Sequence, residues 1–254
     1  MKNLQKKIVA IGGYGKDDHP ADIKGINAKL IELSGKRKPK FLFIPTASDD
    51  SPRYIKKIQD VFAQNLGCEV QHLLLYSEDR PKKLFQEKIE WADIIYVGGG
   101  NTLKMMNLWR RLGVDTALKK AYLAGKVLCG VSAGSICWFD YGVSDSRQFR
   151  NPERNDYIRV SGLGFIPALN NPHHQSGNWD KGHRTYGMKH ILKRHGGFAL
   201  AVPDMCALAF IGDEIQVLKD SKQAGAYKTY FQGSQYVEDE LFSGAAVEDV
   251  LRGV

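Results

Sequence analysis

The sequence lacks the marks of a disulfide scaffold, a secreted protein or a membrane protein. Its four cysteines form no C-x-x-C pair and no regular ladder of spacings, so the fold is expected to need neither disulfides nor a metal. The amino-terminal residues hold only a few apolar positions in a row, too few for a signal peptide. No stretch reaches the roughly 18 uncharged apolar residues of a membrane span. These absences predict a soluble cytoplasmic protein with no membrane partner.

A concentrated basic region is also missing. The net charge is +8, but the clusters of lysine and arginine, for example at 36–38 and 119–120, are scattered along the chain and mostly fall on predicted helices. A nucleic-acid face would gather such charges on one surface, with aromatic residues among them for single strands. We therefore expect a solvated basic surface and no nucleic-acid partner, although the excess charge is compatible with anionic substrates.

Short apolar runs alternate with helical patterns in the first half of the chain. The runs end in glycine, proline or polar residues, and the segments between them carry apolar residues at helical spacing. The expected strands are Lys7–Gly12, Lys40–Pro45, Cys68–Leu75 and Asp93–Val97, and the expected helices are Ile23–Ser34, Pro52–Leu66 and Lys82–Ala92. This alternation predicts an α/β fold, a three-layer α/β/α sandwich with a mostly parallel sheet. Ligands on such sheets bind at the carboxyl ends of the strands.

The second half of the chain is less regular. We expect strands at Val127–Val131, Phe198–Val202, Ala207–Ile211, Glu214–Leu218 and Tyr227–Phe231, with helices from Ala133, over His183–His195 and over Ala245–Leu251. Residues 140–182 are polar and interrupted by Gly, Pro and Asn, which predicts a long functional loop region. No repeat, low-complexity segment or linker divides the sequence, so residues 1–254 are expected to form a single domain.

The most specific local pattern is Gly-Val-Ser-Ala-Gly at 130–134, directly after an apolar run. Gly-x-Ser-x-Gly between a buried strand and a helix is typical of a nucleophile elbow. Such a strained turn lifts the hydroxyl of Ser132 clear of the sheet, and side chains two residues away would collide with neighbouring backbone. The helix that follows exposes free N–H groups to a developing oxyanion. The pattern predicts that Ser132 is a nucleophile.

Nucleotide-binding patterns are missing from the other glycine-rich segments. Neither G-x-x-x-x-G-K-[ST] nor a complete G-x-G-x-x-G occurs. The run Gly98–Gly100 closes the strand before the elbow strand and is followed by Asn101 and Thr102. Its N–H groups are expected at the same sheet edge as Ser132, so we interpret it as a second oxyanion donor rather than a phosphate loop.

A serine hydroxyl needs a base, and the base needs an orienting acid. Of the seven histidines, those at 19, 72, 190 and 195 carry no motif and are expected on the surface or in packing, and His183 opens a predicted helix. The Asn-Pro-His-His segment at 171–174 lies where a side chain could reach Ser132. Because adjacent His173 and His174 cannot both point into one small site, one of them is expected to be structural.

These residues together resemble peptidase E, the aspartyl dipeptidase family, whose flavodoxin-like fold is that of the class I glutamine amidotransferases. The matching features are Gly-Gly-Gly-Asn-Thr at 98–102, Ser-Ala-Gly at 132–134, Asn-Pro-His at 171–173 and Val-Pro-Asp at 202–204. Their order also separates the chain from α/β-hydrolases, in which the histidine comes last. The amidotransferases carry cysteine where this chain has Ser132, which argues against glutamine hydrolysis.

The resemblance implies a catalytic triad. By position, Ser132 corresponds to the nucleophile, His173 to the general base and Asp204 to the acid that orients the histidine. The family usually carries glutamate at that last position, so the aspartate is a departure. Asp145, after the elbow helix, therefore stays open as an alternative acid.

The resemblance also implies the groups that hold the substrate. The oxyanion donors correspond to the backbone N–H groups of Gly99 and Ala133. Asn101 and Arg184 match the positions that hold an acidic substrate side chain, and a planar guanidinium suits a carboxylate. Alternatively, Arg184 is an ordinary surface arginine at the beginning of a helix.

The hypothesis is a serine-type peptidase, monomer or homodimer, that needs no metal or organic cofactor. Its expected substrates are small peptides, in particular dipeptides with an amino-terminal aspartate. Two alternatives stay open: a cyanophycinase-like β-aspartyl peptidase and a catalytically silent ligand-binding relative. A zinc site built from His173, His174 and His183 is a third, although the spacing of a known metal motif is missing.

Overall fold

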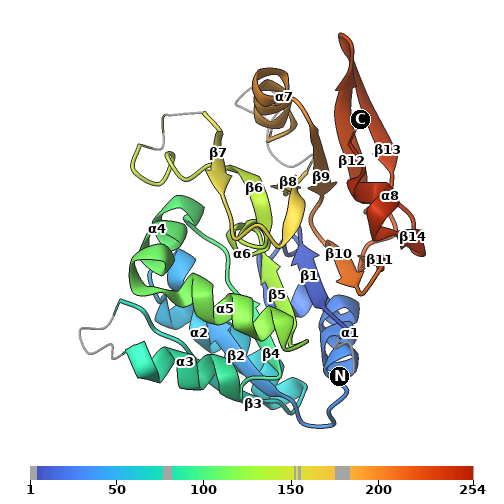
Figure 1. Ribbon diagram of the computed structural model, residues 1–254. Helices are drawn as coiled ribbons and strands as arrows, with labels where there is room; N and C mark the ends of the chain where they lie inside the picture. Colours follow the sequence, from blue (N-terminus) through green and yellow to red (C-terminus); the bar gives the residue numbers. More distant parts are fainter. Residues whose placement is uncertain (1–4, 77–81, 152, 154–155, 175–183, 254) are drawn as a thin grey trace.

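The strands and helices of the first half build an eight-stranded sheet in the computed structural model, which describes residues 5–76, 82–151, 153, 156–174 and 184–253. Its order is β14-β11-β10-β1-β5-β4-β2-β3 (Figure 1). The strands are β1 (Lys7–Ile11), β2 (Lys40–Ile44), β3 (Glu69–His72), β4 (Ile94–Val97), β5 (Val127–Val131), β10 (Cys206–Ile211), β11 (Glu214–Lys219) and β14 (Ala245–Ala246). The five strands from β1 to β3 in this order are parallel, as predicted, and the other three extend the sheet antiparallel.

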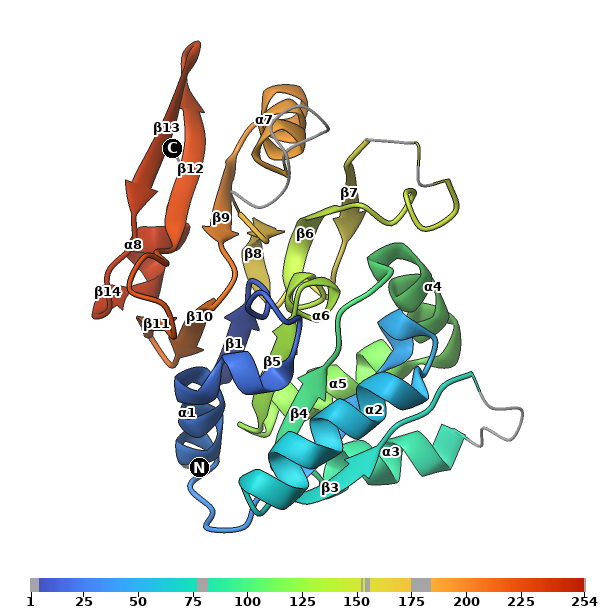
Figure 2. The same cartoon turned by 180° about the vertical axis from the view of Figure 1, so that it is seen from behind.

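Helices cover both faces of this sheet (Figure 2). On one face lie α1 (Lys24–Ser34) and α2 (Pro52–Gln59), which continues as a π-helix over Asp60–Asn65; on the other lie α3 (Lys82–Trp91), α4 (Thr102–Leu112) and α5 (Val114–Leu123). Because side chains alternate along a strand, Tyr96 of β4 packs toward α1 and α2, whereas Val97 packs toward α4 and α5. The predicted three-layer α/β/α sandwich is confirmed. No bounds had been predicted for α4 and α5.

Strands also occupy the region predicted as a long loop. A six-stranded sheet has the order β13-β12-β9-β8-β6-β7. Its strands are β6 (Phe139–Ser144), β7 (Ile158–Ser161), β8 (Ile166–Pro172), β9 (Phe198–Val202), β12 (Tyr227–Gln232) and β13 (Gln235–Glu240). The loop prediction for 140–182 was therefore wrong over β6 to β8. Some of its polar residues are buried; for example, Asn170 is buried and its Nδ2 donates to Ser135 Oγ at 2.8 Å.

The second sheet lies beyond the carboxyl ends of the parallel strands of the first (Figure 1). In sequence, the short helix α6 (Ala133–Ile136) follows β5, and α7 (Arg184–His195) comes after β8 and before β9. The last element of the described chain is α8 (Val247–Leu251). Residues 203–205 join β9 of the second sheet to β10 of the first. One buried apolar cluster contains side chains of both sheets, such as Leu128 and Leu200. The carboxyl ends of β1, β5, β8 and β9 consequently meet in one region.

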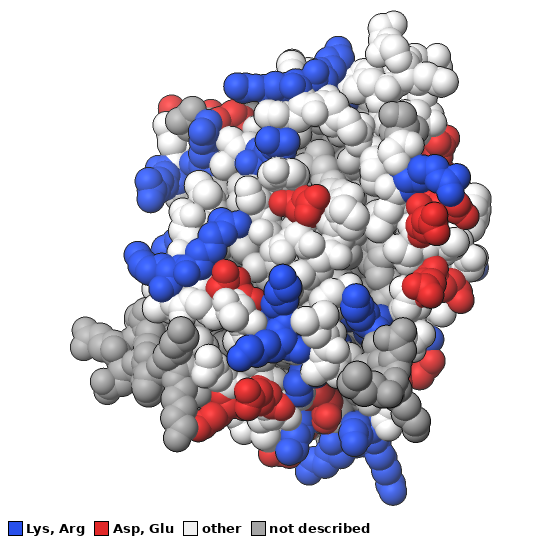
Figure 3. All heavy atoms as spheres, viewed as in Figure 1, with Lys and Arg blue, Asp and Glu red and all other residues white. Residues whose placement is uncertain are grey.

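The surface carries mixed charge. On the face shown in Figure 3, lysine and arginine lie among aspartate and glutamate rather than in one continuous patch. None of the helices in the described part of the chain has both the length and the apolar character needed to cross a membrane. The cysteines at 68, 129, 137 and 206 are all buried and free.

Candidate active site

Ser132 stands on a strained turn between β5 and α6. Its backbone has φ 55° and ψ −116°, a conformation that non-glycine residues rarely adopt. Its N–H donates to the carbonyl of Ile11 on β1 at 3.1 Å, and its carbonyl accepts from the N–H of Ser135 at 2.9 Å. Strain of this kind costs on the order of 1–3 kcal/mol and persists only where the surrounding structure holds it. The sheet on one side and α6 on the other provide that support.

The two glycines that flank Ser132 are sterically required. A Cβ at Gly130 would lie 2.0 Å from the carbonyl oxygen of Gly134, and a Cβ at Gly134 would lie 2.1 Å from the carbonyl oxygen of Val97. The backbone of the elbow therefore packs directly on itself and on β4. This is the close approach that the Gly-x-Ser-x-Gly pattern predicts.

His173 and Asp204 come from the ends of neighbouring strands. His173 directly follows β8, and Asp204 lies two residues after Val202, the last residue of β9; the two strands pair in parallel with Pro172 opposite Val202. His173 Nδ1 lies 2.6 Å from Asp204 Oδ1. The alternative acid, Asp145, instead lies 3.3 Å from Arg184 through its Oδ2 and the arginine Nη2. Among the described contacts, the carboxylate that contacts His173 belongs to Asp204 and not to Asp145.

The turn after β1 is a part of this site that the sequence patterns did not assign. A Cβ at Gly13 would lie 2.0 Å from Asp204 Oδ1 and 2.5 Å from His173 Nδ1. Gly13 and Asp204 also form an isolated parallel β-bridge. At Gly12 a Cβ would lie 2.1 Å from the carbonyl oxygen of Pro203. The available signal was a glycine pair at the carboxyl end of a buried strand, the same edge that carries the elbow. These glycines let the two sheets meet closely enough for the imidazole–carboxylate contact.

Ser132 and His173 line one pocket of about 520 Å³. Gly99 borders the serine closely, since a Cβ there would lie 3.3 Å from Ser132 Cβ and 3.8 Å from its Oγ. The Gly99 N–H donates a long hydrogen bond, 3.4 Å, to Tyr54 Oη, and Ala133 is the residue directly after the serine. Gly100 of the glycine run also lines the pocket, and the further lining residues, not assigned from the sequence, are Tyr14, Asp17, Asp18, Ser48, Ser51, Arg53, Tyr54 and Lys57.

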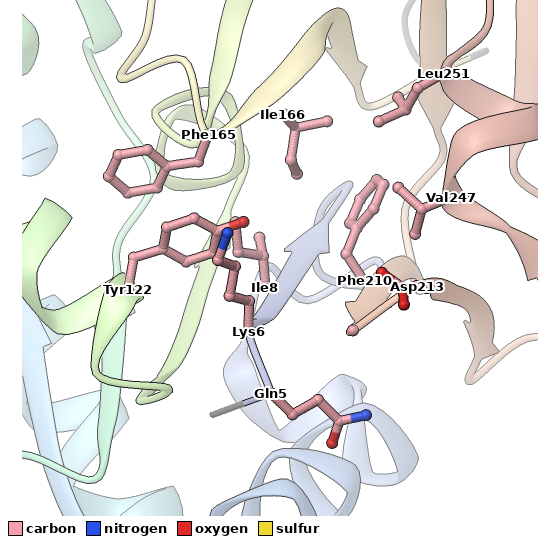
Figure 4. A pocket seen from close by; sticks show the side chains of 11 residues that line it. Gln5, Lys6, Ile8, Tyr122, Phe165, Ile166, Phe210, Asp213, Val247 and Leu251 are labelled. Carbon is pink, nitrogen blue, oxygen red and sulfur yellow. The ribbon is translucent and has the colours of Figure 1, made fainter. Parts of the chain in front are cut away.

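A pocket of similar volume, about 540 Å³, lies at the other end of β1 (Figure 4). Its lining includes the aromatic side chains of Tyr122, Phe165 and Phe210, and Lys6 and Asp213 supply its charges. It has no serine, cysteine or histidine among its lining residues. Volume alone does not separate the two pockets, but among their described lining residues a serine together with a histidine occurs only in the pocket of Ser132.

The side chains of Asn101 and Arg184 are held by other parts of the protein. Asn101 caps α4 by accepting from the Lys104 N–H at 3.0 Å and donates to the Ser146 carbonyl at 3.1 Å. Arg184 is buried and donates to the Val143 carbonyl at 2.8 Å, besides its contact with Asp145. Neither belongs to the described lining of the pocket that holds Ser132.

His174 points away from its neighbour His173. It is fully buried, with Nδ1 3.2 Å from Asn171 Nδ2 and Nε2 3.2 Å from Glu238 Oε1 on β13. One of the two adjacent histidines is thus structural. His183, the third member of the zinc hypothesis, lies outside the described residues, and no group of metal-ligating side chains occurs among those described.

The thiols near the elbow are unsuited to act as nucleophiles. Burial raises the pKa of Cys129, on β5, and of Cys137, after α6, well above the usual value for a thiol. Burial likewise raises the pKa of Cys206 to about 12. These thiols stay protonated near neutral pH, and the thiolate is the reactive form of cysteine. The Ser132 hydroxyl is the remaining candidate nucleophile of the elbow.

A family model described as "Peptidase family S51" matches residues 8–218, from β1 to β11. The chain belongs to peptidase family S51. This S51 chain is accordingly a member of a serine peptidase family, as the resemblance to peptidase E predicted.

Relatives of the S51 chain include bacterial proteins described as peptidases. It is 32% identical over 237 residues to "Uncharacterized peptidase YgaJ" of Bacillus subtilis (strain 168), covering 93% of this chain and 97% of that protein. It is 29% identical over 151 residues to "Peptidase E" of Shewanella denitrificans, covering 58% of this chain and 59% of that protein.

Two solved structures share the fold of the S51 chain. The crystal structure of a peptidase from an acI-B1 Actinobacterium has a TM-score of 0.67 at 23% identity, covering 96% of this chain and 97% of that one. A putative peptidase E protein from Listeria monocytogenes EGD-e has a TM-score of 0.62 at 20% identity, covering 85% and 98%. At these identities the likeness establishes the α/β architecture.

Proposed function

We propose that this S51 peptidase hydrolyses small peptides with an amino-terminal aspartate through Ser132, His173 and Asp204. The observation that carries the proposal is the strained Ser132 in one pocket with His173, whose Nδ1 lies 2.6 Å from Asp204. A carboxylate on Nδ1 leaves Nε2 to accept a proton, which is the arrangement of a general base. The same contact favours Asp204 over Asp145 as the third member.

The proposed reaction is acyl transfer to water. His173 Nε2 takes the Ser132 proton as Oγ bonds to the peptide carbonyl carbon, and the carbonyl oxygen becomes an oxyanion held by the N–H groups of Gly99 and Ala133. The imidazolium then protonates the amine as the C–N bond breaks. Water, activated by the same imidazole, hydrolyses the acyl-enzyme and restores the serine. No step needs a metal or an organic cofactor.

The charges in the pocket support a short zwitterionic substrate. The pocket of about 520 Å³ lies within the usual size range of small-molecule sites. Arg53 lines it from α2, and Asp17 and Asp18 line it from the loop after β1. We assign the substrate's acidic side chain to Arg53, because the guanidinium of Arg184 is held by Val143 and Asp145. The two aspartates are suited to the substrate's ammonium group.

The decisive experiment combines Ser132→Ala with a set of peptides. We expect the variant to fold and to lose hydrolysis, and a fluorophosphonate to label wild-type protein at Ser132. α-Aspartyl, β-aspartyl and neutral dipeptides are assayed side by side, with the α-aspartyl peptide expected to be cleaved fastest. Retained hydrolysis in Ser132→Ala refutes the nucleophile. Preference for β-aspartyl peptides favours the cyanophycinase-like alternative, and absence of labelling favours a silent ligand-binding relative.

The role of Arg53 has its own test. Arg53→Met is expected to raise KM for an α-aspartyl dipeptide about 10–100-fold, the equivalent of a charged hydrogen bond of about 1.5–3 kcal/mol. The matching α-asparaginyl dipeptide, which carries no side-chain charge, is the control and should lose little. Equal losses on both peptides, or a selective loss only in Arg184→Met, would contradict the assignment.

A further inference from the structure

Three tyrosines form a chain of hydroxyl groups that leads from the sheet to the pocket of Ser132. Tyr96 lies on β4 and is fully buried, Tyr14 follows β1 and is 6% exposed, and Tyr54 lies on α2. Tyr14 Oη is 2.8 Å from Tyr96 Oη and 2.8 Å from Tyr54 Oη. Tyr14 and Tyr54 both line the pocket. The triad proposed above uses none of these hydroxyls.

The buried end of the chain determines the direction of its hydrogen bonds. Each phenol has one proton to donate, and Tyr14 is the hydrogen-bond partner of Tyr96 among the described residues. If Tyr14 donated to Tyr96, the Tyr96 proton would be buried without an acceptor, which is unfavourable. Tyr96 therefore donates to Tyr14, and Tyr14 donates to Tyr54. The hydroxyl proton of Tyr54 is then not used within this chain of three tyrosines.

The surroundings keep all three phenols protonated. Burial raises the pKa of Tyr14 and Tyr96 well above the usual value, and it also raises the pKa of Tyr54. Tyr54 Oη accepts from Tyr14 and from the Gly99 N–H at 3.4 Å. Hydrogen bonds received by a hydroxyl oxygen polarise its O–H bond and strengthen it as a donor. Tyr54 thus presents a polarised donor beside Gly99, which borders Ser132.

We propose that Tyr54 is a further catalytic residue, which donates its phenolic hydrogen to the oxyanion formed when Ser132 attacks the substrate. The inference rests on the proposed acyl transfer at Ser132. An oxyanion held by the Gly99 N–H lies close to Tyr54 Oη, because those two groups already contact each other. Tyrosine hydroxyls serve as oxyanion donors in other enzymes. Tyr14 and Tyr96 act as positioning residues that direct the proton into the pocket.

The test compares hydroxyl deletions along the chain. Tyr54→Phe should lower kcat about 10²–10³-fold, the usual loss for one oxyanion donor, with little change in KM. It should also slow fluorophosphonate labelling of Ser132, because the phosphonyl oxygen occupies the oxyanion position. Tyr14→Phe deletes a hydroxyl from the same buried chain but leaves the Tyr54 proton, so its loss should not exceed about tenfold, one hydrogen bond at most. Tyr186→Phe, at an exposed site, is the control.

A fluorinated tyrosine at position 54 separates donation from a purely structural contact. 3,5-Difluorotyrosine keeps the hydroxyl but is more acidic, so kcat should fall at alkaline pH with a lower midpoint than in the wild type. A phenolate at position 54 still accepts from the Gly99 N–H. If Tyr54 only held Gly99 in place, kcat would therefore not fall at alkaline pH. Absence of the alkaline fall, or a kcat in Tyr54→Phe within threefold of wild type, overturns the inference.

The outcomes also distinguish this inference from the proposed function. Retained hydrolysis in Ser132→Ala refutes both the nucleophile and the role of Tyr54. Loss of hydrolysis in Ser132→Ala together with full activity in Tyr54→Phe refutes only the role of Tyr54. In both cases, far-UV circular dichroism of each variant establishes that the protein is folded.

Discussion

At the scale of single residues, the contact between His173 and Asp204 determines which imidazole nitrogen is available for chemistry. A hydrogen bond from Nδ1–H to Asp204 Oδ1 places the ring proton on Nδ1 and the lone pair on Nε2, the nitrogen that takes a proton. The aspartate reaches the ring, although it is one methylene shorter than glutamate, because β8 and β9 are adjacent and Gly13 leaves room beside them. The short acid is therefore compatible with the geometry of this chain.

Asp204→Asn is expected to lower kcat about 10³–10⁴-fold, because an amide no longer holds the imidazole in the reactive tautomer. Asp145→Asn, which changes a carboxylate paired with Arg184, should retain kcat within about threefold. Steady-state kinetics on an α-aspartyl dipeptide measures both variants. The reverse result, a large loss only in Asp145→Asn, would make Asp145 the third triad member.

Gly13→Ala places a methyl group where the two side chains meet. Because its Cβ would lie 2.0 Å from Asp204 Oδ1, the pair must shift, and a displacement of this size typically costs about 100-fold in rate. Overpacking should also lower the free energy of unfolding by about 1–3 kcal/mol. Kinetics and urea denaturation test both effects, with Gly253→Ala, whose Cβ meets open space, as the control. Wild-type kinetics in Gly13→Ala would show that this geometry is dispensable.

At the scale of elements, the β12–β13 hairpin is tied to the sheet end that carries His173. His174 Nδ1 accepts from Asn171 Nδ2, since the amide nitrogen can only donate, so the ring proton sits on Nε2 and faces Glu238 of β13. The contact with His174 is the main cause that lowers the pKa of Glu238. The buried neighbour of the proposed base thus anchors the hairpin.

This anchor predicts a pH-dependent contribution to stability. A carboxylate whose folded pKa is lowered stabilises the protein above the ordinary value of about 4.3, and this contribution is lost as pH falls through the folded pKa. Glu238→Gln should therefore lower the free energy of unfolding by about 1 kcal/mol at neutral pH. The difference from wild type should shrink as pH falls through the lowered pKa of Glu238 and vanish below it, where both side chains are neutral. Urea denaturation at neutral pH and at a series of acidic pH values tests this, with exposed Glu214→Gln as the control; a pH-independent difference contradicts it.

At the scale of the whole molecule, the two sheets share one apolar core. The cluster that contains Leu42 and Leu128 of the first sheet also contains Val160, Ile166 and Leu200 of the second. Separating the sheets would expose these side chains, at about 25 cal/mol for each Å² of apolar surface. We therefore propose that the chain folds as a single domain.

A single domain should unfold in one cooperative transition. Far-UV circular dichroism, which follows both sheets, and tryptophan fluorescence, which follows buried Trp109 and Trp138, should report the same midpoint in urea. Two transitions with separate midpoints would show that the sheets unfold independently.

Local sequence patterns were sufficient for the parallel core and the elbow. The alternation of short apolar runs with helical spacing requires only neighbouring residues, and it predicted β1, β2, β4 and β5 within about one residue of their bounds. The glycines around Ser132 carried a local steric requirement that the structure reproduces. Polar strands were missed, because residues such as Asn170 are buried only after a distant partner, Ser135, accepts their hydrogen bond.

The sequence by itself determined the fold class, the peptidase family and Ser132 as the candidate nucleophile, because each can be read from short motifs whose own residues are neighbours in sequence. Only the tertiary structure decided which carboxylate lies on His173, which histidine is structural, and which residues line the pocket. Those relations join β1, α2, β5, β8 and β9, whose approach depends on the packing of two sheets. No local pattern marks Arg53 or Tyr54, and the glycine pair that includes Gly13 does not by itself show which side chains meet there, since these roles arise from neighbours far away in sequence.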